Sequence, residues 1–174
     1  MKKTSGLVIA WFALLCGCGS VPTDDINVEA RSDPKAELSG YKTYGWLTEA
    51  AIFNDAVGQW EPPDFDADAE IRSLIGRELR KRGKFEEAID PDLVVAFGAG
   101  VNMNVIEAKI NPNGDMQALN VPKGGLLVQL KDGRSGYTIW MGVAKANVKK
   151  RPDTETAKAR LDYAVTEMFK LLPE

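Results

Sequence analysis

The chain contains no histidine, and its only two cysteines, Cys16 and Cys18, lie close together near its start. Nucleophilic sites that rely on histidine as a base and zinc sites with imidazole ligands are therefore excluded. Two cysteines so placed cannot form the disulfide framework of a small secreted domain. The 174 residues are typical of one domain with short appendages, long enough to bury a core without disulfides or metals.

The sequence also lacks an apolar run long enough to cross a membrane, for which a helix needs about 20 residues. Leu7 to Leu15 is a run of nine apolar residues, and Lys2 and Lys3 precede it. A basic start, a short apolar core and small residues after it are typical of a secretory signal peptide. We therefore expect residues 1–17 to be a signal peptide.

The end of this segment, Leu15-Cys16-Gly17-Cys18, resembles the lipobox of bacterial lipoproteins, in which a small residue precedes the cysteine that becomes diacylated. Gly17 occupies the cleavage position, so Cys18 is the predicted lipidation site. Two or three acyl chains would anchor the protein stably in a bilayer, because each buried CH₂ contributes about 0.8 kcal/mol. Gly19 follows the cysteine, as in lipoproteins of Gram-negative bacteria that are forwarded to the outer membrane and face the periplasm. The alternative is an ordinary secreted protein with two incidental cysteines.

The remaining chain divides into a lipidated cysteine with a polar tether, residues 18–25, and a single folded domain, residues 26–174. Without Lys2 and Lys3 the mature chain has 20 basic and 25 acidic residues, a net charge of −5. An acidic chain is not expected to bind nucleic acid. The expected partners are the lipid bilayer, through acylated Cys18, and an envelope protein or a second copy of the chain.

Strand and helix patterns fill the domain. The clearest strand is Asp92–Ile106, where Leu93 begins seven apolar residues at every second position. Such alternation favours an antiparallel sheet with one covered face. Further strands are expected at residues 26–31, 41–47, 126–131 and 137–148.

Two amphipathic helices complete the pattern. The first is expected to be capped by Asp64 or Asp66 and to stop at Gly83, because glycine permits a left-handed backbone. The second is expected to begin at Asp153 or Thr154 and to end near the C-terminus. The order β-β-α-β-β-β-α predicts a two-layer α+β domain: a mostly antiparallel sheet of about five strands with both helices packed on one face.

The chain resembles the bacterial lipoprotein family catalogued as domain of unknown function 4136 (DUF4136), over about Ile26 to Glu174. The resemblance rests on the order of five stretches rather than on one motif. They are Tyr41–Leu47, the helix around Ile71–Gly83, Asp90–Val95, the run from Gly125 through Asp132 to Gly142, and the terminal helix ending in Leu171-Leu172-Pro173. It implies an envelope lipoprotein of α+β fold and supplies no activity.

No pattern identifies a catalytic residue, a metal site or a cofactor. The alternating acids of Asp64–Glu70 resemble the start of a calcium-binding EF-hand loop, which needs glycine at its sixth position and an acid at its twelfth. Ala69 and Ile75 stand there instead, so the acids are better explained as complements to the helix dipole. A basic cluster could bind phosphates, although a solvated helix end explains it better. Its members are Arg77, Arg80, Lys81, Arg82 and Lys84.

Strand alternation also gives a candidate partner-binding patch. In the fifth strand Tyr137, Ile139, Met141 and Val143 form the more continuously apolar row, so we expect this row to face the helices. The outward patch would then contain Trp140, Gly98, Gly100, and Phe53 and Trp60 from the long connection after the second strand. The opposite orientation, with Trp140 in the core, remains open at this point.

Three functions are consistent with these features. The leading hypothesis is a non-catalytic, membrane-anchored envelope lipoprotein that acts as a binding or accessory subunit. A carrier of a small apolar ligand would need a cavity lined by Phe97, Leu161 and Met168. A hydrolase of an envelope polymer would need two carboxylates that meet in a cleft.

Overall fold

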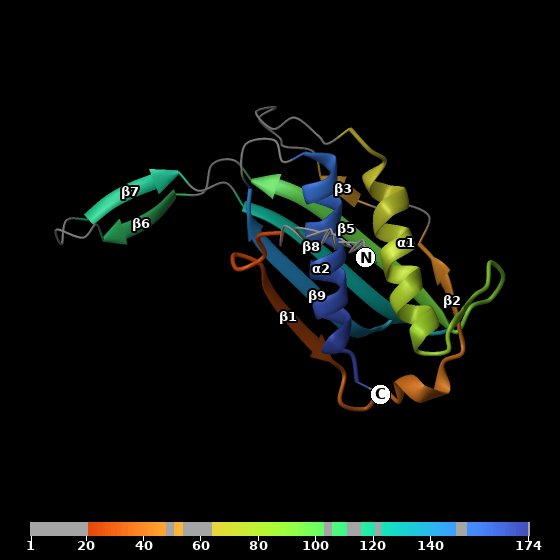
Figure 1. Ribbon diagram of the computed structural model, residues 1–174. Helices are drawn as coiled ribbons and strands as arrows, with labels where there is room; N and C mark the ends of the chain where they lie inside the picture. The colour runs from red at the N-terminus through yellow and green to blue at the C-terminus, as the bar shows by residue number, and fades with distance from the viewer. Residues whose placement is uncertain are drawn as a thin grey trace, which may run out of the picture.

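The computed structural model in Figure 1 describes residues 21–47, 51–53, 64–102, 106–110, 116–120, 123–148 and 153–173. A seven-stranded sheet carries two helices, α1 (Ala67–Lys81) and α2 (Thr154–Lys170), side by side on one face. The strands of this sheet are β1 (Asn27–Ser32), β2 (Thr43–Trp46), β3 (Ala51–Phe53), β4 (Phe85–Glu86), β5 (Leu93–Asn102), β8 (Lys123–Asp132) and β9 (Thr138–Asn147). The predicted two-layer α+β class is therefore confirmed, and the expected count of about five strands is close.

The sheet is mixed, in the order β1-β9-β8-β5-β2-β4, and β3 also pairs with β5. The four long strands pair antiparallel, as expected. The three short strands β2, β3 and β4 add parallel pairs. Parallel pairing of β2 with β5 follows from the chain order, because α1 lies between them and forms the crossover that parallel neighbours require.

Four strands were not predicted. With two or three residues each, β3 and β4 are too short to show an alternating pattern. The other two, β6 (Ile106–Ile110) and β7 (Met116–Asn120), form a separate antiparallel two-stranded sheet. Figure 1 shows this hairpin apart from the main sheet.

The helix boundaries follow the predicted signals. Asp66 caps α1 by accepting a 3.0 Å hydrogen bond from the N–H of Ala69. Asp153 caps α2 in the same way, through the N–H of Thr156 at 2.8 Å. Past the end of α1, Gly83 adopts a φ of 69°, which a residue with a side chain rarely adopts.

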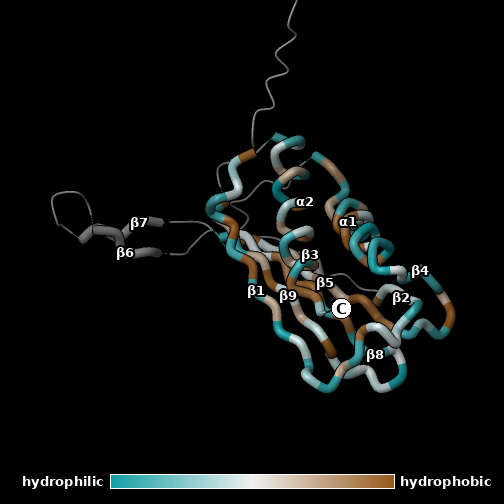
Figure 2. Tube along the Cα trace, turned by 60° about the horizontal axis from the view of Figure 1, so that its bottom comes forward, coloured by the Kyte–Doolittle hydropathy of each residue, from teal (hydrophilic) through white to brown (hydrophobic). Residues whose placement is uncertain are grey.

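The core fills the space between the sheet and the helices, where the hydrophobic colours of Figure 2 concentrate. Leu93, Val95 and Phe97 of β5 face the helices, as their alternation predicted. The core side chains that are fully buried include Tyr44, Ile75, Leu79, Leu130, Val165 and Phe169.

The predicted orientation of β9 is wrong from Trp140 onward, whereas Ile139, opposite the register shift between Leu130 and Lys131, is buried in the core as predicted. Trp140 is only 1% exposed and its ring lies 5.3 Å from that of Phe169 on α2. Met141 and Val143 therefore face away from the helices, and Tyr137 is 77% exposed. The deciding feature is Gly142, because a Cβ there would overlap Met168 of α2 and lie 2.6 Å from the Trp140 ring. The missing side chain lets α2 pack directly on β9, and we call this contact, formed by Gly142, Trp140, Met168 and Phe169, the seam.

We expect Gly142→Ala to lower the free energy of unfolding by about 1–3 kcal/mol, because the added methyl group overpacks this seam. Gly125→Ala on β8 is the matched control: a Cβ there meets its nearest atom, the carbonyl oxygen of Ala144, at an ordinary 3.8 Å. The control should change stability by less than about 0.5 kcal/mol. Urea unfolding followed by tryptophan fluorescence measures both. Equal stability of the two variants would contradict the seam.

Candidate functional site

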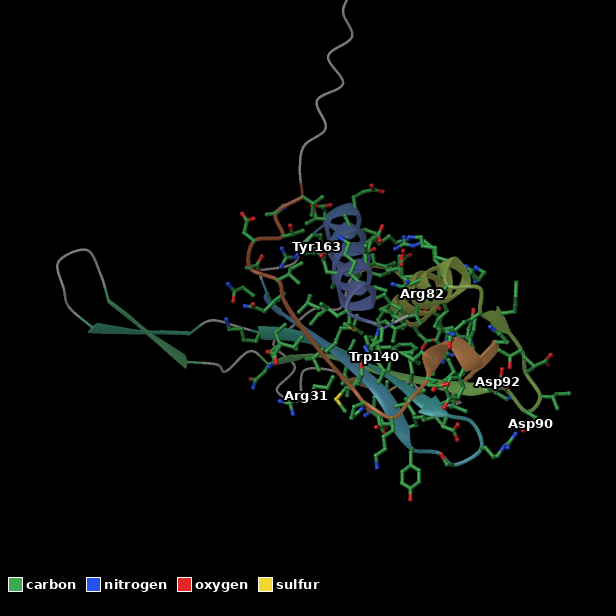
Figure 3. All side chains as sticks on the ribbon, turned by 90° about the horizontal axis from the view of Figure 1, so that it is seen from below. Arg31, Arg82, Asp90, Asp92, Trp140 and Tyr163 are labelled. Atoms are coloured by element: carbon green, nitrogen blue, oxygen red, sulfur yellow. The ribbon has the colours of Figure 1, made fainter. Side chains whose placement is uncertain are left out.

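The sheet face opposite the helices, here called the open face, is the candidate binding surface. Strand register aligns two rows of residues across it. One row runs Ala96, Gln129, Met141, Arg31, and the next runs Gly98, Leu127, Val143, Glu29. Among the described residues, no helix or strand lies over these rows, and in Figure 3 Arg31 lies on the far side of the sheet from α2.

The centre of the open face is apolar and its rim is charged. Leu127, Met141 and Val143 remain half-buried there, because side chains on adjacent strands shield one another. Ala96, which is half-buried, extends this face onto β5, where the next residue of the same parity, Gly98, is buried. At the β1 edge the rim carries Glu29, Arg31 and Lys145, and Lys145 pairs with Glu29 at 3.7 Å. An apolar centre with a polar rim is the usual anatomy of a protein interface.

The structure corrects the predicted patch at its centre. Trp140 lies in the core, and Gly98, although strand alternation puts it on the side of the open face, is itself buried. Gly100 pairs in register with Phe53 of β3, so these two predicted residues come from neighbouring strands. Trp60 lies outside the described residues. The row that replaces Trp140, Met141 with Val143, was visible in the sequence but was assigned to the wrong face.

The basic cluster at the end of α1 serves the contact between the helices. The Arg77 guanidinium donates to the Asp162 carboxylate of α2 at 2.6 Å, and that of Arg82 donates to the Phe169 carbonyl at 2.5 Å. Glu78, only 4% exposed, accepts from Lys81 and Arg77. Burial raises the pKa of the Glu78 carboxyl, but these hydrogen bonds and charges outweigh burial and hold the pKa below its ordinary value. This cluster therefore has a structural role.

Lys84, another member of the basic cluster, is 5% exposed and donates 2.8 Å hydrogen bonds to the carbonyls of Leu38 and Tyr41. Burial lowers the pKa of its ammonium group. Lys84 thus fastens the chain before β2 to the end of α1, and it does not point to a phosphate ligand.

The acids of Asp64–Glu70 also have structural partners. Beyond the Asp66 cap, Asp68 pairs with Arg72 at 2.7 Å, and Glu70 pairs with Lys158 of α2 at 2.9 Å. Among the residues that the structure describes, no group of three or more acidic or cysteine side chains is arranged to hold a metal ion. The arrangement is that of a capped and charge-paired helix start.

A shallow hollow of about 390 Å³ lies at one end of the sheet. It is lined by Asp25, Asn27, Glu29, Lys123, Lys145 and Ala146. The lining is of mixed charge, so it does not resemble a pocket for an apolar ligand. Of the three residues that would line an apolar cavity, Phe97 and Met168 are buried in the core and Leu161 packs against it.

Beside this hollow, four groups fasten the start of the domain, and we call them the tether clamp. The Arg160 guanidinium of α2 grips the Asp25 carboxylate with two hydrogen bonds of 2.9 and 2.8 Å and also donates to the carbonyl of Pro22. The N–H of Asn147, at the end of β9, donates to Asp25 at 2.9 Å. The hydrogen bond from Arg160 holds the pKa of the Asp25 carboxyl below its ordinary value.

Residues 28–174 match the family model described as "Domain of unknown function (DUF4136)". The chain belongs to the DUF4136 family. The resemblance found in the sequence is thereby confirmed. No curated protein sequence matches this DUF4136 protein significantly.

Solved structures share the fold at low identity. A DUF4136 family protein from Bacteroides thetaiotaomicron matches with 10% identity and a TM-score of 0.53, covering 84% of this chain and 95% of that one. A PDZ domain protein from Parabacteroides distasonis matches with 14% identity and a TM-score of 0.52, covering 86% of this chain. The DUF4136 protein spans only 37% of that relative's length.

A PelC dodecamer from Paraburkholderia phytofirmans matches with 17% identity and a TM-score of 0.46, over 82% of this chain and 97% of that one. At these identities the likeness of the first two structures shows the fold alone. Within the described part of the chain, neither helix is long and apolar enough to cross a membrane.

Proposed function

We propose that this DUF4136 protein is a non-catalytic lipoprotein of the bacterial cell envelope. Acylated Cys18 anchors it, at the outer membrane in a Gram-negative host, and the open face binds an envelope protein or a second copy as an accessory or assembly subunit. The observation that carries the proposal is the uncovered apolar centre of the open face, in a chain whose N-terminal sequence resembles a lipobox.

The anchor rests on the sequence around Cys18. The nine apolar residues of Leu7–Leu15 are too few to span a bilayer, and a small residue, Gly17, precedes the cysteine. The described domain begins close behind, with Pro22 and Asp25 already bound to Arg160. A chain built in this way is held at a surface and requires no transmembrane helix.

The binding role rests on the contrast between the two faces of the sheet. One face is sealed by α1 and α2, while the other keeps Leu127, Met141 and Val143 at its centre with no described element above them. Covering such a surface with a partner is favourable, by about 25 cal/mol for each Å² of apolar area removed from water.

The two alternative functions gain less support. The space between the sheet and the helices is filled by core side chains, which disfavours a carrier. The two carboxylates at the hollow, Asp25 and Glu29, are paired with Arg160 and Lys145, which favours a structural role over hydrolysis.

We expect Cys18→Ala to release the protein from the membrane fraction, because this change removes the only predicted site for acyl chains. The measurement is fractionation of cells followed by a carbonate wash, with Ser20→Ala as the matched control in the same tether. The control should remain in the membrane fraction. Retention of Cys18→Ala after the wash would contradict the anchor.

A photo-crosslinking amino acid at Val143, on the open face, should form an adduct in intact envelopes when the wild-type anchor is present. The same group at Tyr163, which is 38% exposed on α2, is the control and should give little adduct. An adduct of twice the mass identifies a second copy, and any other mass identifies an envelope protein. Equal crosslinking at both positions, or none at Val143, would contradict binding through the open face.

A further inference from the structure

The tether clamp fixes where the chain leaves the domain. Arg160 is 16% exposed and Asp25 is 21% exposed, so this ion pair is shielded from water more than an ordinary surface pair. Its two parallel hydrogen bonds add the geometric specificity of a bidentate arginine–carboxylate pair. The additional hydrogen bond from Arg160 to the Pro22 carbonyl extends these contacts toward the N-terminus.

The length of chain between the anchor and the clamp is short. Cys18 and Pro22 are four residues apart. A fully extended chain covers at most about 3.3–3.6 Å per residue, so the Pro22 backbone can lie no farther than about 14 Å from Cys18. The headgroup layer on each side of a bilayer is itself about 5–8 Å thick. The clamped end must therefore stay close to the lipid headgroups.

The same end gathers the termini of several elements. The clamp joins the start of β1 to the end of β9, through Asn147, and to the first turns of α2, through Arg160. At the opposite end of the sheet lies the turn between β8 and β9, which contains Arg134. Because the ten residues of β8 span about 30 Å, the distances of the two ends of the domain from an anchoring membrane can differ by up to about that length.

We infer that the tether clamp docks this end of the domain, with its hollow between β1, β8 and β9, against the lipid surface. The domain is then held upright, with the long strands of its sheet pointing away from the membrane. The inference rests on the proposed lipid anchor at Cys18. It deepens that proposal, because an upright sheet turns the open face sideways, toward other proteins in the same membrane. Without the clamp the first fixed residue would be Asn27 in β1, nine residues from Cys18, and the reach would grow to about 30 Å.

The test uses the full-length, acylated protein in phosphatidylcholine vesicles that contain a lipid with a nitroxide on its headgroup. A fluorophore is attached at Asn27→Cys, near the clamp, or at Arg134→Cys, at the far turn; both side chains are exposed. Once Cys16 is cleaved off and Cys18 is acylated, the introduced thiol is the only one available. We expect severalfold stronger quenching at position 27 than at position 134.

The clamp variant is Arg160→Met, with Asp25→Asn as a second variant that keeps the size of the side chain. Either should cut the difference in quenching between the two positions by at least half, while circular dichroism and the melting curve show a folded domain. Lys158→Met is the matched control, because it removes an ion pair with Glu70 from the same helix without touching the tether. It should preserve the difference.

Two results would overturn the inference. Equal quenching at both positions in the vesicle-bound wild type would show that the domain has no preferred end toward the membrane. A folded Arg160→Met or Asp25→Asn protein that keeps the full difference would show that the clamp does not set the orientation. Failure of the wild-type protein to bind vesicles at all is a separate result, and it would overturn the lipid anchor.

Discussion

The architecture depends on the close contact between β9 and α2 at Gly142. With no Cβ at this position, Met168 of α2 reaches the strand backbone, and the rings of Trp140 and Phe169 meet with centroids 5.3 Å apart. The contact is strong enough to bury the Trp140 indole N–H without an acceptor among the described residues. Such a group costs about 1–3 kcal/mol, which the packing around it must offset.

This seam decides which face of the sheet is covered. Once Trp140 faces inward, Met141 and Val143 must face outward, because successive strand residues alternate between faces. The ion pairs and hydrogen bonds of Arg77 and Arg82 then hold α1 against α2, so the helical layer closes over one side only. The apolar open face is thus a direct consequence of the packing. At the end of β9 and the first turns of α2, the tether clamp joins the same two elements to the start of β1.

Local signals in the sequence were sufficient for much of this fold. The caps Asp66 and Asp153, the stop at Gly83 and the alternation of β5 depend on neighbouring residues, so each could be identified without the rest of the chain. The orientation of β9 could not be identified in this way. Both of its rows are largely apolar, and a one-residue choice moves every side chain to the other face.

Long-range contacts account for what was missed. The residue that Gly142 accommodates, Met168, belongs to the last helix, and the clamp joins Asp25 to Arg160 across almost the whole chain. No local pattern in the sequence indicates either contact. The parallel pairing of β2 with β5, in contrast, was implicit in the order strand, helix, strand, and could have been predicted from it.

The most direct test of this account compares two adjacent positions of β9. Val143→Cys and Ala144→Cys are small changes on opposite faces, and Ala144 is 4% exposed. In the native protein a water-soluble maleimide should modify the thiol of Val143→Cys rapidly, and the thiol of Ala144→Cys only after denaturant is added. Faster modification at position 144 than at position 143 would contradict the orientation of β9 and, with it, the open face.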